Sequence, residues 1–294
     1  MRNALCLAML LIAPLAAREP LAKRIASTDP AKYRVAKSVH GGAGQLDYMS
    51  LLDYRALDTN FFFLHRGVIQ PKSGIGAHFH NQCEEMFVIL DGEAQFTIDG
   101  RTSVLKGPAG APVRMGHSHG IYNHTDKPVQ WMNINVSAMK GTYDAFDLSD
   151  SRIDVQVDPI PVFMSMRLDR NLLRPAADLH GGKGIVKSRR ALGPSVFLGP
   201  WAYVDHLEID PNSSLGPHLH REVAEVYYVM NGQGTVTVSD RDGSDTAPIR
   251  AGDAIPVHLN EVHSFANRGS EPLEFLVIGV SRDNTRRVDV LSSR

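Results

Sequence analysis

The chain has very few cysteines, and this limits how its fold can be stabilised. Only Cys6 and Cys83 occur among its 294 residues. Cys6 lies in an N-terminal segment that we expect to be removed, which would leave Cys83 without a partner. A disulfide framework is therefore excluded for the mature chain, and stability has to come from packing and from any bound metal.

Neither sign of charge is in clear excess. The 31 Lys and Arg residues balance 32 Asp and Glu residues, and no basic run or basic stretch interleaved with aromatics occurs. Nucleic-acid binding normally requires such a basic footprint. We therefore expect a small-molecule substrate and no nucleic-acid partner.

Long apolar runs are also missing. The run from Ala4 to Ala17 has fourteen residues and contains Pro14, whereas a membrane-spanning helix needs about 20. With the charged start at Arg2, the pattern predicts a signal peptide over residues 1–17 and no membrane span. We expect a periplasmic or secreted protein, with a cytoplasmic one as the alternative.

The chain does contain a repeated motif, His-x-His-x4-Glu-x6-Gly followed later by His-x3-Asn. Its ligand-type residues are His78, His80, Glu85 and His119 in the first copy. In the second copy they are His218, His220, Glu225 and His263. Two complete sets in the same order indicate one fold that has been duplicated and fused.

Residues outside the motif repeat as well, and they define the domains. The stretch 40–44 (His-Gly-Gly-Ala-Gly) returns at 180–184 (His-Gly-Gly-Lys-Gly), and we interpret both as tight turns. The distance between the copies grows from 140 to 144 residues between Gly232 and His263. This predicts a four-residue insertion at the turn 240–245. We expect domains at 28–150 and 160–294, with a linker near 147–162.

Short segments rich in β-branched and aromatic residues alternate with Gly, Asn and Pro turns, which is typical of an all-β sandwich or barrel. The best helix candidate is the stretch from Asp169 to Leu179. The predicted strands are Phe61–Ile69, Glu85–Leu90, Ala94–Ile98, Tyr203–Ile209, Val226–Met230, Thr235–Val238 and Leu273–Val280.

Strand geometry explains the spacing of the motif. Side chains alternate along a strand, so His78 and His80 share one face while Phe79 points away. Glu85 can then face them from the next strand, and His119 arrives from a later one. Three imidazoles and one carboxylate converging in a barrel suit a divalent transition metal. We interpret Cys83 as a bystander, since its counterpart is Val223.

This arrangement resembles the cupin superfamily, and the chain looks like a bicupin. The likeness covers about residues 60–140 and 200–282. Arg114 stands where the family's second motif usually has Pro, and His258 and Asn260 replace its Pro and Gly in the other half. Asn tolerates the left-handed turn conformation. The resemblance implies two tandem double-stranded β-helix (jelly-roll) barrels, each with one metal ion.

Fe(II) or Mn(II) is the metal that we expect, with Ni, Co, Cu and Zn open. Two free coordination positions could hold a substrate and dioxygen together. The leading hypothesis is therefore a dioxygenase or oxidative decarboxylase acting on a small, oxygen-rich anion. A sugar or uronic acid isomerase or lyase, and a non-catalytic carbohydrate- or carboxylate-binding protein, stay as alternatives. A homodimer is also left open.

Other residues near the motifs are candidates for the chemistry. Glu261 and His117 precede the last ligand of their halves and could move protons. Arg114 and His258 could contact a substrate, and Arg114 could hold a carboxylate. Strand parity places four more side chains in the cavities: Phe87, Ile89, Tyr227 and Val229.

Overall fold

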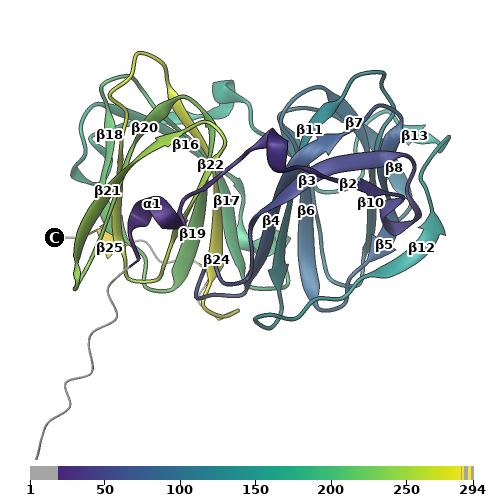
Figure 1. The fold of residues 1–294 in the computed structure, drawn as a ribbon, viewed down its shortest axis with the longest axis horizontal. Helices are drawn as coiled ribbons and strands as arrows, with labels where there is room; N and C mark the ends of the chain where they lie inside the picture. Colours follow the sequence, from purple (N-terminus) through teal and green to yellow (C-terminus); the bar gives the residue numbers. More distant parts are fainter. Residues whose placement is uncertain (1–18, 286, 288–290, 293–294) are drawn as a thin grey trace, which may run out of the picture.

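The computed structural model describes residues 19–285, 287 and 291–292. It consists almost entirely of strands, arranged as two barrels side by side, each made of a larger and a smaller sheet that face each other (Figure 1). The all-β, two-barrel prediction is confirmed. The signal peptide predicted over residues 1–17 lies outside the described residues.

The N-terminal barrel has a seven-stranded and a six-stranded sheet. The larger contains, in spatial order, β14 (Met166–Arg167), β9 (Ala109–Val113), β6 (Cys83–Ile89), β11 (Val129–Ser137), β4 (Phe61–Ile69), β3 (Gln45–Leu52) and β2 (Arg34–Lys37). The smaller contains β12 (Phe146–Asp150), β5 (Ser73–Phe79), β10 (Ser118–Asn123), β7 (Glu93–Ile98), β8 (Arg101–Lys106) and β13 (Val157–Asp158).

The C-terminal barrel repeats this plan. Its seven-stranded sheet contains β1 (Ala26–Ser27), β22 (Asp253–Val257), β19 (Val223–Asn231), β24 (Leu273–Ser281), β17 (Trp201–Ile209), β16 (Ile185–Leu192) and β15 (Arg174–Ala177). Its five-stranded sheet contains β21 (Gly243–Arg250), β20 (Gln233–Asp240), β23 (Val262–Ala266), β18 (Ser214–Leu219) and β25 (Leu291–Ser292).

Helical structure is limited to short turns among the described residues. These are α1 (Leu21–Arg24) and the 3₁₀ turns η1 (Pro30–Lys32), η2 (Val39–Gly41), η3 (Arg170–Leu172), η4 (Leu179–Gly181) and η5 (Pro194–Val196). None of them is long and apolar enough to cross a bilayer. The helix predicted over Asp169–Leu179 is wrong: Pro175 cannot donate an amide hydrogen, and β15 forms there instead.

The four extra residues of the second half lie in the hairpin that the spacing of the repeat predicted. The hairpin β20–β21 turns between Asp240 and Gly243, and each of its strands has eight residues. The equivalent strands β7 and β8 have six residues each. The insertion thus lengthens both arms of one hairpin by two residues and leaves the barrel register intact. Asn260 adopts the expected left-handed conformation, with φ 65°.

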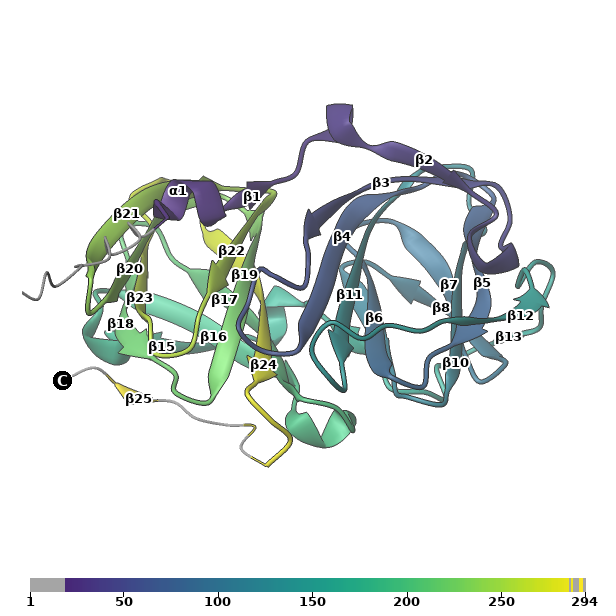
Figure 2. The same cartoon turned by 60° about the horizontal axis from the view of Figure 1, so that its bottom comes forward.

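The segments that flank the N-terminal barrel pack in a way that the sequence did not indicate. The first described segment, α1 and β1, packs on the C-terminal barrel (Figure 2). There β1 pairs with β22, and Leu21 is fully buried. In the predicted linker, β12 pairs with β5 and β13 with β8, so this stretch extends the N-terminal barrel. The N-terminal segment therefore straps the two barrels together.

The outer faces of the two larger sheets pack against each other and form a core between the barrels. Trp201, fully buried, stacks on Phe197 there, with ring centroids 4.6 Å apart. Arg66 is buried and bonds the hydroxyl of Tyr228 across the interface, at 3.0 Å. Because these sheets are covered on both faces, the central strands β6 and β24 are buried along their whole length and are mostly apolar.

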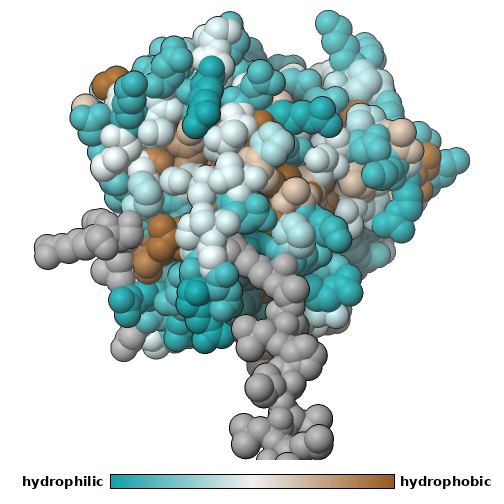
Figure 3. All heavy atoms as spheres, turned by 60° about the vertical axis from the view of Figure 1, so that its left-hand side comes forward, coloured by the Kyte–Doolittle hydropathy of each residue, from teal (hydrophilic) through white to brown (hydrophobic). Residues whose placement is uncertain are grey.

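Elsewhere the sheets meet solvent, and the alternation of side chains shows it. β20 carries Thr and Ser on its outer face and buries Val236 and Val238. The face of the C-terminal barrel in Figure 3 is accordingly mostly hydrophilic, with only small, separated apolar spots.

Candidate metal centres

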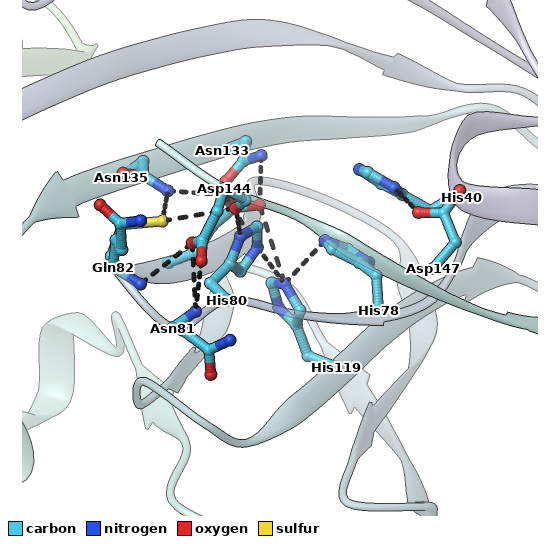
Figure 4. A network of polar contacts seen from close by, with 12 residues as sticks. His40, His78, His80, Asn81, Gln82, His119, Asn133, Asn135, Asp144 and Asp147 are labelled. Carbon is cyan, nitrogen blue, oxygen red and sulfur yellow. Dashed lines mark hydrogen bonds and ion pairs between the residues drawn. The ribbon is translucent and has the colours of Figure 1, made fainter. Parts of the chain in front are cut away.

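The first four predicted ligands meet inside the N-terminal barrel. His78 on β5 lies directly opposite His119 on β10 in the smaller sheet, while Glu85 faces them from β6 of the larger one. His80 follows the end of β5. All four are buried, with donor atoms within 4.8 Å of one another (Figure 4).

The spacing of these donors suits a single ion. Nε2 of His119 lies 3.0 Å from Nε2 of His78 and 3.3 Å from Nε2 of His80. The Glu85 oxygens lie 3.6 Å from His80 Nε2 and 3.8 Å from His119 Nε2. Bonds of about 2.1 Å to one ion place neighbouring ligand atoms about 3 Å apart. Without a cation, these lone pairs would repel one another.

Hydrogen bonds fix the ring nitrogen that points inward. The Nδ1 of His78 donates to the Gly76 carbonyl at 2.9 Å, and that of His80 donates to the Asp144 carbonyl. Because a carbonyl can only accept, Nδ1 carries the proton and Nε2 keeps its lone pair for a metal. Burial also lowers the pKa of His78 to about 3, so the ring is neutral at physiological pH.

Two asparagines of β11 hold the carboxylate. Asn133 Nδ2 donates to one oxygen of Glu85 at 2.7 Å, and Asn135 Nδ2 donates to the other at 2.8 Å (Figure 4). Register explains the contacts, since Glu85 lies opposite Asn135 and Phe87 opposite Asn133, and paired residues share a face. The sequence interpretation missed both asparagines, although two inward amides in an otherwise apolar strand were a usable signal.

A cavity of about 210 Å³ adjoins this quartet. Its wall includes His78 and Glu85, so a molecule in the cavity could contact an ion held by the quartet. The remaining lining residues are Val39, His40, Leu46, Tyr48, Phe63, His65, Ile75, Trp131, Asn133 and Tyr143.

The second quartet is built the same way in the C-terminal barrel. His218 on β18 lies opposite His263 on β23, Glu225 enters from β19, and His220 follows β18. All four are buried and their donor atoms also lie within 4.8 Å of one another. Nε2 of His263 is 3.1 Å from Glu225 Oε2. The Nδ1 of His218 donates to the Gly216 carbonyl at 2.9 Å.

The neighbours of the second carboxylate differ from those of the first. Tyr203 donates to one oxygen of Glu225 at 2.7 Å, and Tyr227 donates to the other at 3.0 Å. Gly279 stands where the first half has Asn135, and a Cβ there would lie 2.6 Å from the Tyr203 ring. The glycine therefore makes room for the tyrosine. Although burial raises the pKa of Glu225, the nearby His220 and His263 keep it below the ordinary value.

Both halves contain a stacked pair of histidines that the sequence interpretation did not anticipate. His40 stacks on His78 with ring centroids 3.8 Å apart, and His180 stacks on His218 at 4.4 Å. Both stacked residues have positive φ, near 50°, inside the tight turns that the Gly-Gly-x-Gly stretches predicted. His40 also pairs with Asp147 through Nδ1 (Figure 4).

Cys83 lies near the first quartet and is fully buried. Its sulfur, His80 and Asp144 form a third close group. His80 already belongs to the quartet, however, and Asn135 donates to the sulfur at 3.2 Å. Burial raises the pKa of the thiol to about 12, which disfavours a thiolate ligand. These contacts fit the predicted bystander.

Arg114 and His117 lie away from the cavity, in a shallow groove outside the barrel. The Arg114 guanidinium donates to the backbone carbonyls of Val196 and Ser195, at 2.6 and 2.9 Å. His117 is half exposed and pairs with Asp99 at 2.6 Å. Arg114 thus connects the N-terminal barrel to η5 of the C-terminal half.

Glu261 and His258 lie together in a groove between the barrels that Arg24 of the N-terminal strap also lines. Arg24 donates to both oxygens of Glu261, at 2.6 and 2.7 Å. Burial raises the pKa of Glu261, but Arg24 and the His258 amide outweigh this and hold it below the ordinary value. His258 lies 3.6 Å from Asp58. The ion pair between Arg24 and Glu261 attaches the N-terminal segment to the C-terminal barrel.

The four residues predicted from strand parity all point inward. Phe87 stacks on His119 at 4.4 Å, and Tyr227 lies 3.2 Å from Nε2 of His263. Ile89 and Val229 are fully buried one layer deeper in the apolar core. Phe87 and Ile89 are absent from the wall of the N-terminal cavity, to which β3, β4 and β11 contribute six residues alongside those of β5, β6, η2 and Tyr143.

Comparison with known proteins agrees with the fold and the repeat. A family profile described as "Cupin domain" matches residues 65–135 and 205–279. An oxalate-binding protein from Thermotoga maritima is 31% identical over 102 residues, which is 35% of this chain and 81% of that protein. The chain belongs to the cupin family. Two matched regions in tandem make it a bicupin.

Solved structures similar to this bicupin include two oxalate decarboxylases. That of Lactobacillus farciminis, in complex with formate, gives a TM-score of 0.64 at 16% identity and covers 91% of this chain and 90% of its own. A Bacillus subtilis oxalate decarboxylase, studied for its Mn(II) centres, gives 0.62 at 16% identity, covering 91% and 79%. At these identities the likeness establishes the shared bicupin fold.

Proposed function

We propose that this bicupin is a metal-dependent enzyme that acts on a small, oxygen-rich anion by dioxygenation or oxidative decarboxylation. The observation that carries the proposal is the N-terminal quartet, whose His78 and Glu85 form part of a cavity wall. The relatives add support, because one is named for binding oxalate and others for decarboxylating it.

The N-terminal centre is the proposed site of turnover. His78, His80, Glu85 and His119 would hold a divalent ion, which when bound supplies a Lewis acid for an oxygen ligand. Asn133 and Asn135 hold both oxygens of Glu85 in place. Three neutral rings and one carboxylate leave a divalent ion with a charge of about +1, which favours an anion.

Manganese is the first metal to test, because the Bacillus subtilis enzyme is described with Mn(II) centres. Fe(II) remains the other main candidate, and the donor set also accepts Ni, Co, Cu and Zn. The second quartet is proposed to bind an ion with a mainly structural role, since the described cavity adjoins the first quartet, whereas Tyr203 and the Arg190 guanidinium over its ring lie beside the second carboxylate.

Elemental analysis of protein purified without a His tag tests the metal, and an oxygen electrode with carbon dioxide detection tests the reaction. We expect up to two metal ions per chain and substrate-dependent oxygen uptake or carbon dioxide release. Turnover that persists without oxygen and yields no carbon dioxide would contradict the proposal.

A second candidate is a non-catalytic carboxylate-binding protein, favoured by the name of the Thermotoga maritima relative. Calorimetry would then detect tight binding while the oxygen and carbon dioxide assays stay silent across a broad panel of substrates. Export to the periplasm or medium also remains a proposal, and N-terminal sequencing of the protein from cell fractions would test cleavage after Ala17.

A further inference from the structure

The wall of the N-terminal cavity contains no Lys or Arg. Burial lowers the pKa of His65 to about 4, so this ring is uncharged at pH 7. His40 is paired with the carboxylate of Asp147. The cavity thus offers a positive charge only through an ion held by the quartet.

This charge distribution discriminates between anions. An ion in the quartet carries about +1, which a monoanion neutralises. A dianion would bring a second negative charge into a buried space with no cation to receive it, and burying an unpaired charge is costly. Arg114, the residue that the sequence suggested for a second carboxylate, donates instead to Ser195 and Val196.

The shape and lining of the cavity favour a flat, partly apolar molecule. Tyr48, Phe63, Trp131 and Tyr143 supply aromatic faces, and Val39, Leu46 and Ile75 supply aliphatic ones. An apolar protein cavity of about 150 Å³ is known to hold benzene. A volume of about 210 Å³ therefore accommodates roughly one ring with one or two small substituents.

A guanidinium does lie near the rim of the cavity, and the main alternative is that it binds the second carboxylate of a dianion. Arg34 on β2 is opposite Tyr48 on β3, so the two side chains leave the same face of the sheet. Its charge contributes, after burial, to the lowered pKa of His65. Arg34 is nevertheless exposed and is not among the lining residues.

We propose that the N-terminal cavity selects a flat monoanion about one ring in size, bound through a phenolate or enolate oxygen, over a dianion such as oxalate. The inference rests on the proposed metal-dependent function and names the substrate class of the same site. It separates this bicupin from its relatives named for oxalate.

The test is a calorimetric titration of full-length, Zn(II)-loaded protein with catechol and oxalate, with the zinc content measured before and after. Catechol is expected to bind about tenfold or more tightly than oxalate. Ile75→Phe should fill the cavity and weaken catechol at least about tenfold, while zinc content and the circular dichroism spectrum stay unchanged. Arg34→Ala should leave catechol affinity unchanged.

Each result has one meaning. Equal or tighter binding of oxalate by metal-loaded protein overturns the inference, and loss of that binding in Arg34→Ala would identify the rim guanidinium as the partner of its second carboxylate. Protein that takes up no zinc in the N-terminal quartet contradicts the proposed function instead. Catechol binding that Ile75→Phe does not weaken would place catechol outside this cavity and also overturn the inference.

Discussion

The two metal centres share four ligands and differ in what surrounds the carboxylate. In the N-terminal barrel, amides from Asn133 and Asn135 hold Glu85 beside a cavity. In the C-terminal barrel, phenols from Tyr203 and Tyr227 hold Glu225. Duplication thus preserved the ligands while the residues that support the carboxylate diverged.

The residues next to Tyr203, beside the second centre, also differ from their counterparts in the first half. Arg190 and Asp205 stand at the positions of Ser50 and His65, and they form an ion pair with contacts of 3.0 and 3.1 Å. The Arg190 guanidinium also lies 4.1 Å from the centre of the Tyr203 ring. The cation in the second barrel is therefore already paired, whereas the first barrel has none in its wall.

Removing one ligand from each centre should give the largest difference in activity between the two barrels. His78→Ala should lose one metal ion and lower kcat/KM by about 1,000-fold or more, because substrate would lose its anchoring ion. His218→Ala should lose the other ion and lower kcat/KM by less than about tenfold. Metal analysis with steady-state kinetics checks both variants, and equal losses of activity would refute the assignment of turnover to the N-terminal half.

The hydrogen bonds that hold each ligand carboxylate should affect metal affinity only in their own barrel. Asn135→Ala is expected to weaken metal binding in the first barrel, and Tyr203→Phe in the second, each by about 10- to 100-fold. Competition with a chelator measures these affinities. Tyr228→Phe is a matched control, since that hydroxyl bonds Arg66 and not a ligand. An effect of Tyr203→Phe on the N-terminal site would show that the centres are coupled.

Acid should destabilise the metal-free protein in a defined window. Burial lowers the pKa of His65 to about 4, so between about pH 6.5 and 4 the unfolded chain binds a proton that the folded chain does not. The free energy of unfolding therefore falls as the pH drops through this window, by on the order of 1 to 3 kcal/mol for this residue. Urea unfolding at several pH values should show a shallower fall for His65→Asn, and an unchanged slope would contradict the buried, neutral state.

The smallest effect is expected at Arg114. Because its guanidinium donates to carbonyls of η5 in the C-terminal half, Arg114→Ala should change KM by less than about twofold. Its main effect should be a modest loss of stability, of about 1 kcal/mol. A tenfold rise in KM, with the melting temperature preserved, would restore the sequence-based role in holding a carboxylate.

Much of the fold was predictable because the repeat supplied two examples of each element. β4 begins and ends at the predicted Phe61 and Ile69, and the extra four residues appear in the β20–β21 hairpin. The helix predicted near Asp169 failed because Pro175 cannot donate an amide hydrogen and the stretch pairs instead with the next strand, β16. The preference for a strand depends on that partner and on packing, which the stretch does not itself encode.

The sequence by itself determined the all-β bicupin architecture and the eight residues that converge, because ligand spacing and side-chain alternation are local properties. Only the tertiary structure decided what surrounds them. The inward amides and phenols, the cavity wall from β3 and β4, and the pairing of Glu261 with Arg24 across 237 positions all depend on which distant strands lie side by side. That is why the ligands could be named from the chain alone, while the room for a substrate could not.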